Sequence, residues 1–209
     1  MNQFSMRDIV FNYELEQIKN LMLYLEKVNV LWEEEKRNID EKYKSLKDEN
    51  HEHWDSVFAD YEDEYHVFEL FSINLKHSVY ITAWMTFESM SRKIYEDIAT
   101  KKGESKSIIK ENTKFIDKLI KHHLKSKLWK EVIVEEDLID DIDRYKKVRN
   151  NIIHNNGQVQ QGDLKKAEYK DIVIKSYRMD FSSEYLHEYV ESICSFLEQM
   201  YVYKENIER

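Results

Sequence analysis

The sequence predicts an all-α fold, and three observations support this class. The chain of 209 residues has no proline and only three glycines, and its first 102 residues contain neither. β-rich folds need both residues for their many tight turns, whereas long helices exclude them. Apolar residues recur every three or four positions through most of the chain, which is the period of one buried helical face. With 42% hydrophobic and 13% aromatic residues, such helices can bury a core.

Residues 6–66 are predicted to be helical, and we expect domain 1–66 to be an acidic extension ahead of a helical bundle over 67–209. Between residues 33 and 69, fourteen acids stand against five Lys or Arg, so this part is expected to be solvated. One unbroken helix would reach roughly 90 Å, and a break is predicted near residues 48–53. A heptad seam of alternating four- and three-residue spacing indicates packing within the chain or between two copies. Its positions are Phe11, Leu15, Ile18, Met22, Leu25, Asn29, Trp32, Lys36, Ile39, Tyr43 and Leu46.

The remaining elements follow the same logic of apolar periodicity. A strong apolar stripe predicts a helix over 70–100, and a helix over 107–127 carries apolar residues on one side and lysines on the other. Near residues 171–181 the apolar residues alternate instead, which predicts one short β-hairpin. A final amphipathic helix follows, with Ser182 or Ser183 as its N-cap.

The net charge of −9 disfavours loose binding to nucleic acid, but the charge is unevenly distributed. Residues 101–130 hold ten lysines and three acids, so this segment carries +7 and the other 179 residues carry −16. The lysines lie three or four residues apart and line one helical face, which is either a solvated face or a track for RNA. The candidate RNA-binding residues are Lys110, Lys114, Lys118 and Lys121, with Lys146 and Lys147 on the next helix.

The sequence indicates a cytoplasmic protein. Its single cysteine, Cys194, cannot form an internal disulfide, which fits a reducing compartment. The N-terminal residues include acids where a signal peptide would be apolar, and no apolar run is long enough to span a bilayer. His51 and His53 lack an organised third ligand, so we expect no metal site and no cofactor.

The stretch 137–157 is the most informative part of the chain. Its apolar residues follow one helical face, and Asn155, Asn156 and Gly157 are predicted to end the helix, because Asn and Gly tolerate the left-handed conformation. Arg149 and His154 fall in its last two turns. On an ideal helix these two positions are about 140° apart. They converge only if the last turn loosens or if a second copy of the helix faces the first.

An arginine and a histidine at this place suit the cleavage of RNA without a metal ion. A base must take the proton of the ribose 2′-OH, an acid must protonate the leaving 5′-oxygen, and a cation must stabilise the phosphorane. Histidine transfers protons near neutral pH, and arginine offers a forked set of donors to phosphate oxygens. One chain supplies only one of each, so a two-fold dimer through this helix is expected to bring two of each into one cleft.

The string from Arg149 to His154, with Asn150 directly after the arginine, resembles the R-x4-6-H motif of the HEPN superfamily. The resemblance covers roughly residues 70–209 and not the acidic N-terminus. It implies a four- or five-helix bundle, a homodimer through the motif helix, and metal-independent endoribonuclease activity on single-stranded RNA. It further implies a role in toxin, abortive-infection or antiviral systems, with a possible antitoxin or other regulatory protein as partner. By this resemblance Arg149 binds phosphate and His154 is catalytic.

Plainer interpretations remain open for each residue. Arg149 and His154 also fit a surface arginine and a histidine at a helix end, and Asn155 also fits a simple helix stop. Glu88 could orient the arginine or pair with Arg92 one turn away on its own helix. Two other functions are consistent with the sequence. One is a HEPN-type module that binds RNA, nucleotide or protein without catalysis, and the other is a helical interaction protein whose acidic N-terminus is the working part.

Overall fold

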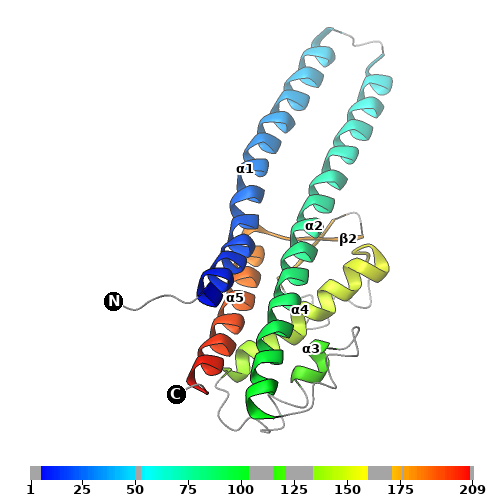
Figure 1. Cartoon of the computed structure of the whole chain (residues 1–209). Helices are drawn as coiled ribbons and strands as arrows, with labels where there is room; N and C mark the ends of the chain where they lie inside the picture. The colour runs from blue at the N-terminus through cyan, green and yellow to red at the C-terminus, as the bar shows by residue number, and fades with distance from the viewer. Residues whose placement is uncertain are drawn as a thin grey trace.

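Two long antiparallel helices run the length of the molecule (Figure 1). They are α1 (Met6–Glu49) and α2 (Trp54–Lys102), and the chain reverses direction between them. The computed structural model describes residues 6–49, 53–103, 115–120, 134–159, 171–175 and 177–207. The all-α class and the single short β-hairpin expected from the sequence are both confirmed.

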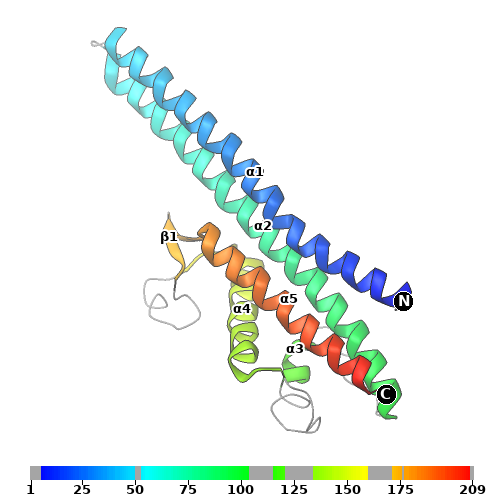
Figure 2. The same cartoon turned by 90° about the vertical axis from the view of Figure 1, so that its left-hand side faces the viewer.

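The acidic halves of α1 and α2 project from the bundle as a helical hairpin, and they pack against each other (Figure 2). Trp32 of α1 stacks on Phe68 and Phe71 of α2, with ring centroids 4.2 and 5.0 Å apart. Nearer the tip, Glu64 accepts hydrogen bonds from both Lys42 and Tyr43 at 2.8 Å. The outer part of the heptad seam is therefore satisfied within one chain.

The predicted break near residues 48–53 falls where α1 ends and α2 begins. The predicted helix over 70–100 is the inner half of α2, which starts sixteen residues earlier because residues 54–69 pair with α1. α2 continues without interruption through residue 66, where the sequence suggested a domain boundary. Residues 15–25 of α1 also belong to the bundle, since Leu15, Ile18, Met22 and Leu25 are buried in the same core as α2 and α5.

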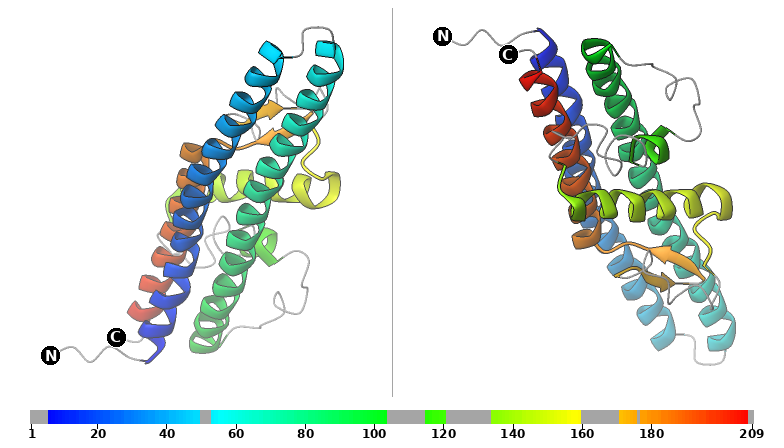
Figure 3. Two further views of the ribbon diagram at one scale, coloured as in Figure 1. Left: turned by 90° about the horizontal axis from the view of Figure 1, so that it is seen from above. Right: turned by 90° about the horizontal axis from the view of Figure 1, so that it is seen from below.

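Helices α4 (Glu136–Asn155) and α5 (Ser183–Asn206) complete the bundle, and α4 runs across α2 and α5 (Figure 3). The crossing is built from tyrosines. The rings of Tyr80 and Tyr189 stack with centroids 4.0 Å apart, Tyr80 donates a hydrogen bond to the carbonyl of Tyr145, and Tyr189 donates one to the carbonyl of Tyr80. Each hydroxyl thus finds a buried partner, as buried polar groups require. The short helix α3 (Phe115–Lys118) packs on α2, where the ring of Phe115 meets the ring of Tyr95 edge-on.

Local sequence explains where the helices of the bundle start and stop. α2 ends at Gly103 and α4 ends at Asn156, both in the left-handed conformation with φ of 66° and 53°. Gly157 follows with φ of 71°. α5 starts with Ser182 as N-cap, whose hydroxyl accepts a hydrogen bond from the backbone N–H of Tyr185.

Two three-residue strands form the hairpin that precedes α5. They are β1 (Val173–Lys175) and β2 (Arg178–Asp180), and they pair antiparallel with Ile174 opposite Met179. All three residues of β2 are buried, whereas Val173 and Lys175 of β1 are exposed, so β2 is the strand that packs on the bundle. Across the ranges that the structure describes, no helix combines the length and the apolarity needed to cross a membrane.

Candidate functional site

The last turns of α4 lie beside a cavity of about 440 Å³ between α4, α2 and α3. Arg149 and His154 both line it, although an ideal helix places them about 140° apart. Both side chains line the same cavity because the arginine side chain is long and His154 lies in the final turn of α4. Its floor is apolar, with Trp84, Phe115 and Ile116 buried beneath it. The other polar residues of its lining are Glu88, Asp117, Lys146 and Asn150.

The Arg149 guanidinium is fixed on two sides and open on a third. Its Nη1 donates a hydrogen bond of 3.0 Å to Oδ1 of Asn150, and its Nη2 lies 3.9 Å from Oε2 of Glu88. Its Nε is buried and has no hydrogen-bond partner among the described residues. The side chain keeps 27% of its surface exposed, toward the cavity. A forked cation held in this way can accept an anion without first being ordered.

Glu88 holds two arginines at once. Its Oε1 accepts a hydrogen bond of 2.6 Å from Arg92, and its Oε2 faces Arg149. The i,i+4 pair with Arg92 is therefore present, and the same carboxylate also lies within ion-pair distance of Arg149, so the two alternatives offered by the sequence do not exclude each other. The guanidinium of Arg92 also lies over the ring of Phe115, 4.4 Å from its centroid. This cation–π contact ties α3 to α2 beside the cavity.

The lysines of α4 are engaged with neighbouring carboxylates. Lys146 is ion-paired with Asp117 of α3 and, at 2.6 Å, with Asp143, and only 15% of its side chain is exposed. Burial lowers the pKa of Lys146, but these two carboxylates outweigh burial and raise it. Lys147 is half exposed and lies 3.3 Å from Asp143. A phosphate would have to compete with these carboxylates for both ammonium groups.

The remaining predicted residues are spread more widely. His154 and Asn155 are exposed in the last turn of α4, and Asn155 lies outside the lining of the cavity. Lys118 is half-buried in α3 and is also outside the lining. Lys110, Lys114 and Lys121 lie outside the described residues, as does most of the helix predicted over 107–127.

A group of residues around the buried His77 and Arg178 fixes the end of α4, and the sequence pattern points only to Gly157 among them. His77 of α2 is 5% exposed and donates a hydrogen bond of 2.8 Å to the carbonyl of Met179. Its ring lies against Gly157, where an added Cβ would come within 2.3 Å of His77 Cε1. Gly157 accepts a backbone hydrogen bond from Met179 at 2.9 Å. The glycine thus lets α2, the end of α4 and β2 meet.

Arg178 completes this arrangement from β2. Although only 8% exposed, it donates to the backbone carbonyl and side-chain oxygen of Asn156 at 3.1 and 3.0 Å, and to Oδ1 of Asn74 at 2.8 Å. The residue directly after α4 is therefore anchored to α2 through one guanidinium. We call His77, Asn74, Asn156, Gly157 and Arg178 the exit network, because they hold the chain where it leaves α4.

These contacts join residues as many as 104 positions apart, so a single sequence gives little sign of them. The only sequence signal was Gly157, which was assigned to the helix stop alone. Trp84, Phe115 and Asp117 also line the cavity, yet their periodicity indicated only a core and a helix face. The position of Glu88 one helical turn from Arg92 was the one clue to the surroundings of Arg149.

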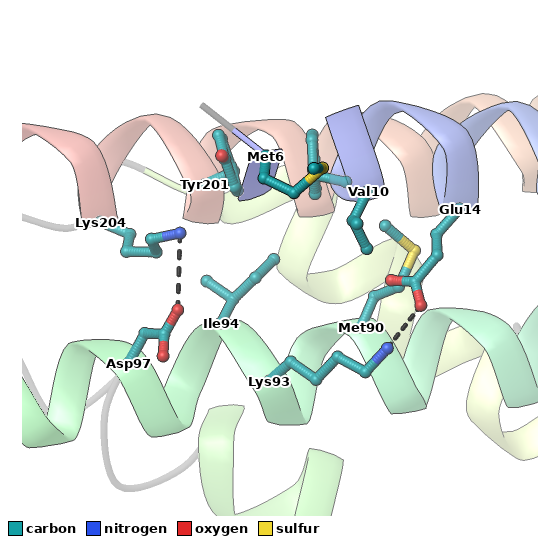
Figure 4. A pocket seen from close by; sticks show the side chains of 10 residues that line it. Met6, Val10, Glu14, Met90, Lys93, Ile94, Asp97, Tyr201 and Lys204 are labelled. Carbon is teal, nitrogen blue, oxygen red and sulfur yellow. Dashed lines mark hydrogen bonds and ion pairs between the residues drawn. The ribbon is translucent and has the colours of Figure 1, made fainter. Parts of the chain in front are cut away.

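A second cavity, of about 260 Å³, lies where α1, α2 and α5 meet (Figure 4). Its walls are largely apolar, formed by residues such as Met90, Ile94 and Tyr201. The charged groups around it are paired with each other across the gap, Lys93 with Glu14 and Lys204 with Asp97. It therefore offers packing surface and no arrangement for proton transfer, whereas the cavity at Arg149 combines a cation, an imidazole and carboxylates.

Within the described ranges, no group of three or more His, Cys, Asp and Glu side chains is placed to hold a metal ion. Comparisons with protein-family models, with curated proteins and with solved structures found no match. The resemblance to the HEPN superfamily therefore depends on the motif from Arg149 to His154, and on its position at the end of a helix in an all-α bundle.

Proposed function

We propose that this protein is a metal-independent endoribonuclease of the HEPN type, acting on single-stranded RNA in a toxin, abortive-infection or antiviral role. Arg149 binds the phosphate at the scissile bond and stabilises the charge of the phosphorane. His154 transfers a proton in the step in which the ribose 2′-OH attacks that phosphate. The products are a 2′,3′-cyclic phosphate and a 5′-hydroxyl, and DNA is inert because it has no 2′-OH.

The observation that carries this proposal is the shared cavity of Arg149 and His154. The arginine is half-buried and held by Glu88 and Asn150, while the histidine is exposed at the mouth. A preorganised cation next to an accessible imidazole is what a phosphoryl-transfer site without a protein nucleophile needs.

Two proton transfers need two groups, and one chain has one histidine at this site. A two-fold dimer through α4 supplies the second imidazole and the second guanidinium. Ile153, between Asn150 and His154 in this turn of α4, is 47% exposed and gives such a contact an apolar centre. An antitoxin or another regulatory protein that covers this face of α4 would silence the enzyme.

A competing function is supported by the neutralisation of the cations. Arg149 faces Glu88, and Lys146 faces Asp117 and Asp143, which reduces the net positive charge that RNA would meet. A module that binds a nucleotide or a protein without cleaving RNA is compatible with these pairs. The two functions differ in one outcome, since only the enzyme produces new RNA ends that depend on His154.

The test is cleavage of a single-stranded RNA by purified protein in the presence of EDTA. The wild type is expected to cleave it, and His154→Ala is expected to lose at least about 100-fold in rate, which is the usual range for a general acid or base. His187→Ala is the matched control, because the side chain of His187 is 45% exposed but pairs with Glu26 of α1, away from α4. Cleavage that survives in His154→Ala, or that EDTA abolishes, would rule out this mechanism.

A further inference from the structure

The outer face of α1 is far more apolar than the rest of the described surface. Among the described residues, sixteen large hydrophobic side chains are exposed, and eight of them lie on the first 26 residues of this one helix. Each of the eight keeps between 48% and 76% of its surface exposed. We call them the α1 patch: Met6, Ile9, Val10, Tyr13, Leu23, Tyr24, Val30 and Leu31.

Most of the α1 patch lies opposite the side of α1 that enters the core, and Met6 and Val10 at its N-terminal end also border the cavity between α1, α2 and α5. The core side is formed by Leu15, Ile18, Met22 and Leu25, which are at most 4% exposed. α1 forms one edge of the molecule, with α2 and α5 on its inner side (Figure 2). The members of the patch stay exposed in a single chain, so the patch is available for contact with another molecule.

The spacing of this outer face is that of a second coiled-coil seam. Five members of the α1 patch fall on a register that alternates by four and three residues, as heptad positions that pack against another helix do, and the other three positions of that register are polar. Such a register has no role in a helix face that only meets water, where single scattered apolar residues are the norm. The seam consists of Met6, Val10, Tyr13, Gln17, Asn20, Tyr24, Lys27 and Leu31.

The seam is self-complementary when it is read in opposite directions. If two copies pair antiparallel about an axis between Gln17 and Asn20, Met6 of one faces Leu31 of the other, and Tyr13 faces Tyr24. Gln17 then faces Asn20 near the axis, where their amides can hydrogen-bond to each other. The two-fold axis makes two such polar layers, and buried polar layers set register in coiled coils. The flanking Ile9 and Val30 lie close to each other in the same arrangement.

Only one layer mixes polar and apolar residues. Lys27 faces Val10, and a lysine stem can lie along an apolar side chain while its ammonium stays in water. In a parallel pair each residue would face its own copy, so Lys27 would meet Lys27 and like charges would repel. The sequence of the seam therefore favours the antiparallel arrangement.

The area is sufficient for a stable contact. Each member of the α1 patch keeps roughly 100 Å² exposed, so together they offer roughly 800 Å², which is what one partner contributes to an interface of standard size. One end of the seam also adjoins the rest of the bundle, since Met6 and Val10 border the cavity between α1, α2 and α5, which the Glu14–Lys93 ion pair spans (Figure 4).

We infer that α1 is a dimerisation surface, whose partner is α1 of a second copy in the antiparallel register centred between Gln17 and Asn20. α4 lies on the far side of α2 and α5 (Figure 2). This interface is therefore separate from the proposed ribonuclease site, and the two proposals can be tested independently.

Disulfide cross-linking tests the register directly. Tyr13 and Tyr24 face each other across the proposed interface, so the double variant Tyr13→Cys/Tyr24→Cys is expected to oxidise to a covalent dimer that a reductant dissolves. Either single variant is expected to stay uncross-linked, because the two copies of one position are about 16 Å apart along the axis, beyond the reach of a disulfide. Cys194 stays out of the reaction, because it is buried and burial raises its pKa to about 12.

Two results would overturn the inference. Cross-linking of Tyr13→Cys alone would mean a parallel pair, and no cross-linking of the double variant would mean no such contact. Sedimentation at equilibrium gives a second measurement that needs no cysteine. Tyr13→Glu/Leu31→Glu is expected to lower the mass of the wild-type assembly by at least half, whereas Val202→Glu, an equally exposed position on α5, is expected to leave it unchanged.

Equal masses for the wild type and the α1 double variant would also contradict the inference. Thermal melts followed by circular dichroism check that all variants remain folded, which the exposure of the substituted side chains predicts. Ile153→Glu on α4 separates the two proposals. It is expected to remove RNA cleavage and to leave the disulfide cross-link of the double cysteine variant intact.

Discussion

At the scale of single residues, Arg149 shows how a surface cation becomes a candidate catalytic group. Its guanidinium is held by Asn150 at 3.0 Å and faces Glu88 at 3.9 Å, while its Nε has no partner among the described residues. The fork is thus ordered before any ligand arrives. Two hydrogen-bonding directions, and not the charge alone, are what distinguish arginine from lysine at such a place.

Arg149→Lys is therefore expected to fail although it keeps the positive charge. We expect a loss of about 100-fold in the rate of RNA cleavage, close to that of Arg149→Ala, because one ammonium cannot replace two aligned donors. Single-turnover cleavage rates of the two variants measure this. Arg144→Lys is the control, since Arg144 pairs with Asp141 on another face of α4. A near wild-type rate for the Arg149→Lys variant would show that only charge matters.

Gly157 is the second residue with a specific structural demand. It combines a φ of 71° with a ring of His77 so close that a Cβ would lie 2.3 Å from it. Gly103 has nearly the same φ, 66°, but a Cβ there would meet nothing within 4 Å. Substituting Gly103 therefore tests backbone strain alone, whereas substituting Gly157 tests backbone strain together with a steric clash.

Gly103→Ala is expected to lower the free energy of unfolding by about 1–2 kcal/mol, from the left-handed backbone alone. Gly157→Ala is expected to lower it by about 1–3 kcal/mol more, because the methyl group forces His77 to move. Urea denaturation of both variants gives the comparison. In a His77→Ala background the extra cost of Gly157→Ala should disappear, and equal costs for the two glycines would contradict the described contact.

At the scale of elements, the sequence predicted each boundary that local chemistry controls. α4 ends at Asn155–Gly157, a break separates residues 49 and 54, and the β-hairpin lies within 171–181. Asn, Gly and Ser signal such ends within a few residues. The sequence did not reveal that residues 54–69 pair with α1. A heptad seam shows that a helix packs against another helix, but it does not identify the partner helix.

The exit network was invisible for the same reason. His77, Arg178 and Asn156 are far apart in the chain, and their roles arise only when α2, β2 and the end of α4 meet.

The chemistry of the exit network has a consequence for acid stability. Burial lowers the pKa of His77, the hydrogen bond to Met179 partly offsets this, and the charge of Arg178 lowers it further.

We expect stability to fall as the pH drops below the unfolded pKa of His77, about 6.5. The folded pKa is depressed, so the unfolded chain binds the proton first, and the loss continues until the pH passes the folded value. Lys76 and Arg178 oppose charging of the ring, and Asp180 favours it. The free energy of unfolding at several pH values between 7.5 and 5 measures this for wild type and His77→Gln. Parallel profiles for the two proteins would contradict a neutral, buried His77.

At the scale of the whole molecule, acidic residues are concentrated in the projecting hairpin of α1 and α2, whereas the candidate site lies in the bundle. The first half of α1 cannot be removed without damage, because Leu15, Ile18, Met22 and Leu25 are in the core. The outer hairpin is different, since its contacts, such as Tyr43 with Tyr61 and Lys42 with Glu64, are made within it. It can therefore be shortened as a unit.

Replacing residues 40–62 with a short glycine-rich turn is expected to leave the fold and RNA cleavage intact. The Trp32–Phe68 stack, the core and the cavity at Arg149 all lie outside the removed part. Cleavage rates and melting temperatures of the shortened and full-length proteins give the comparison. Loss of activity in a shortened protein that remains folded would show that the acidic hairpin is the working part.

We propose two separate faces for self-association, the α1 patch on one side and α4 on the other. Together, two different two-fold contacts would join copies into an assembly larger than a dimer. Ile153→Glu and Tyr13→Glu/Leu31→Glu should each reduce this assembly to dimers, and their combination should give monomers. Sedimentation equilibrium resolves these masses, and a combined variant that stays dimeric would mean that a third surface is involved.

We propose that Arg149 and His154 direct attack by the 2′-OH of RNA on the adjacent phosphate. The most direct measurement uses one RNA oligonucleotide, first mapped for its cleavage position and then synthesised with a single 2′-deoxy nucleotide 5′ of the scissile phosphate. In EDTA, we expect cleavage of the all-ribose strand to a 2′,3′-cyclic phosphate and a 5′-hydroxyl, and no cleavage at the deoxy position. Cleavage that persists at the deoxy position, or equal cleavage by His154→Ala, would contradict it.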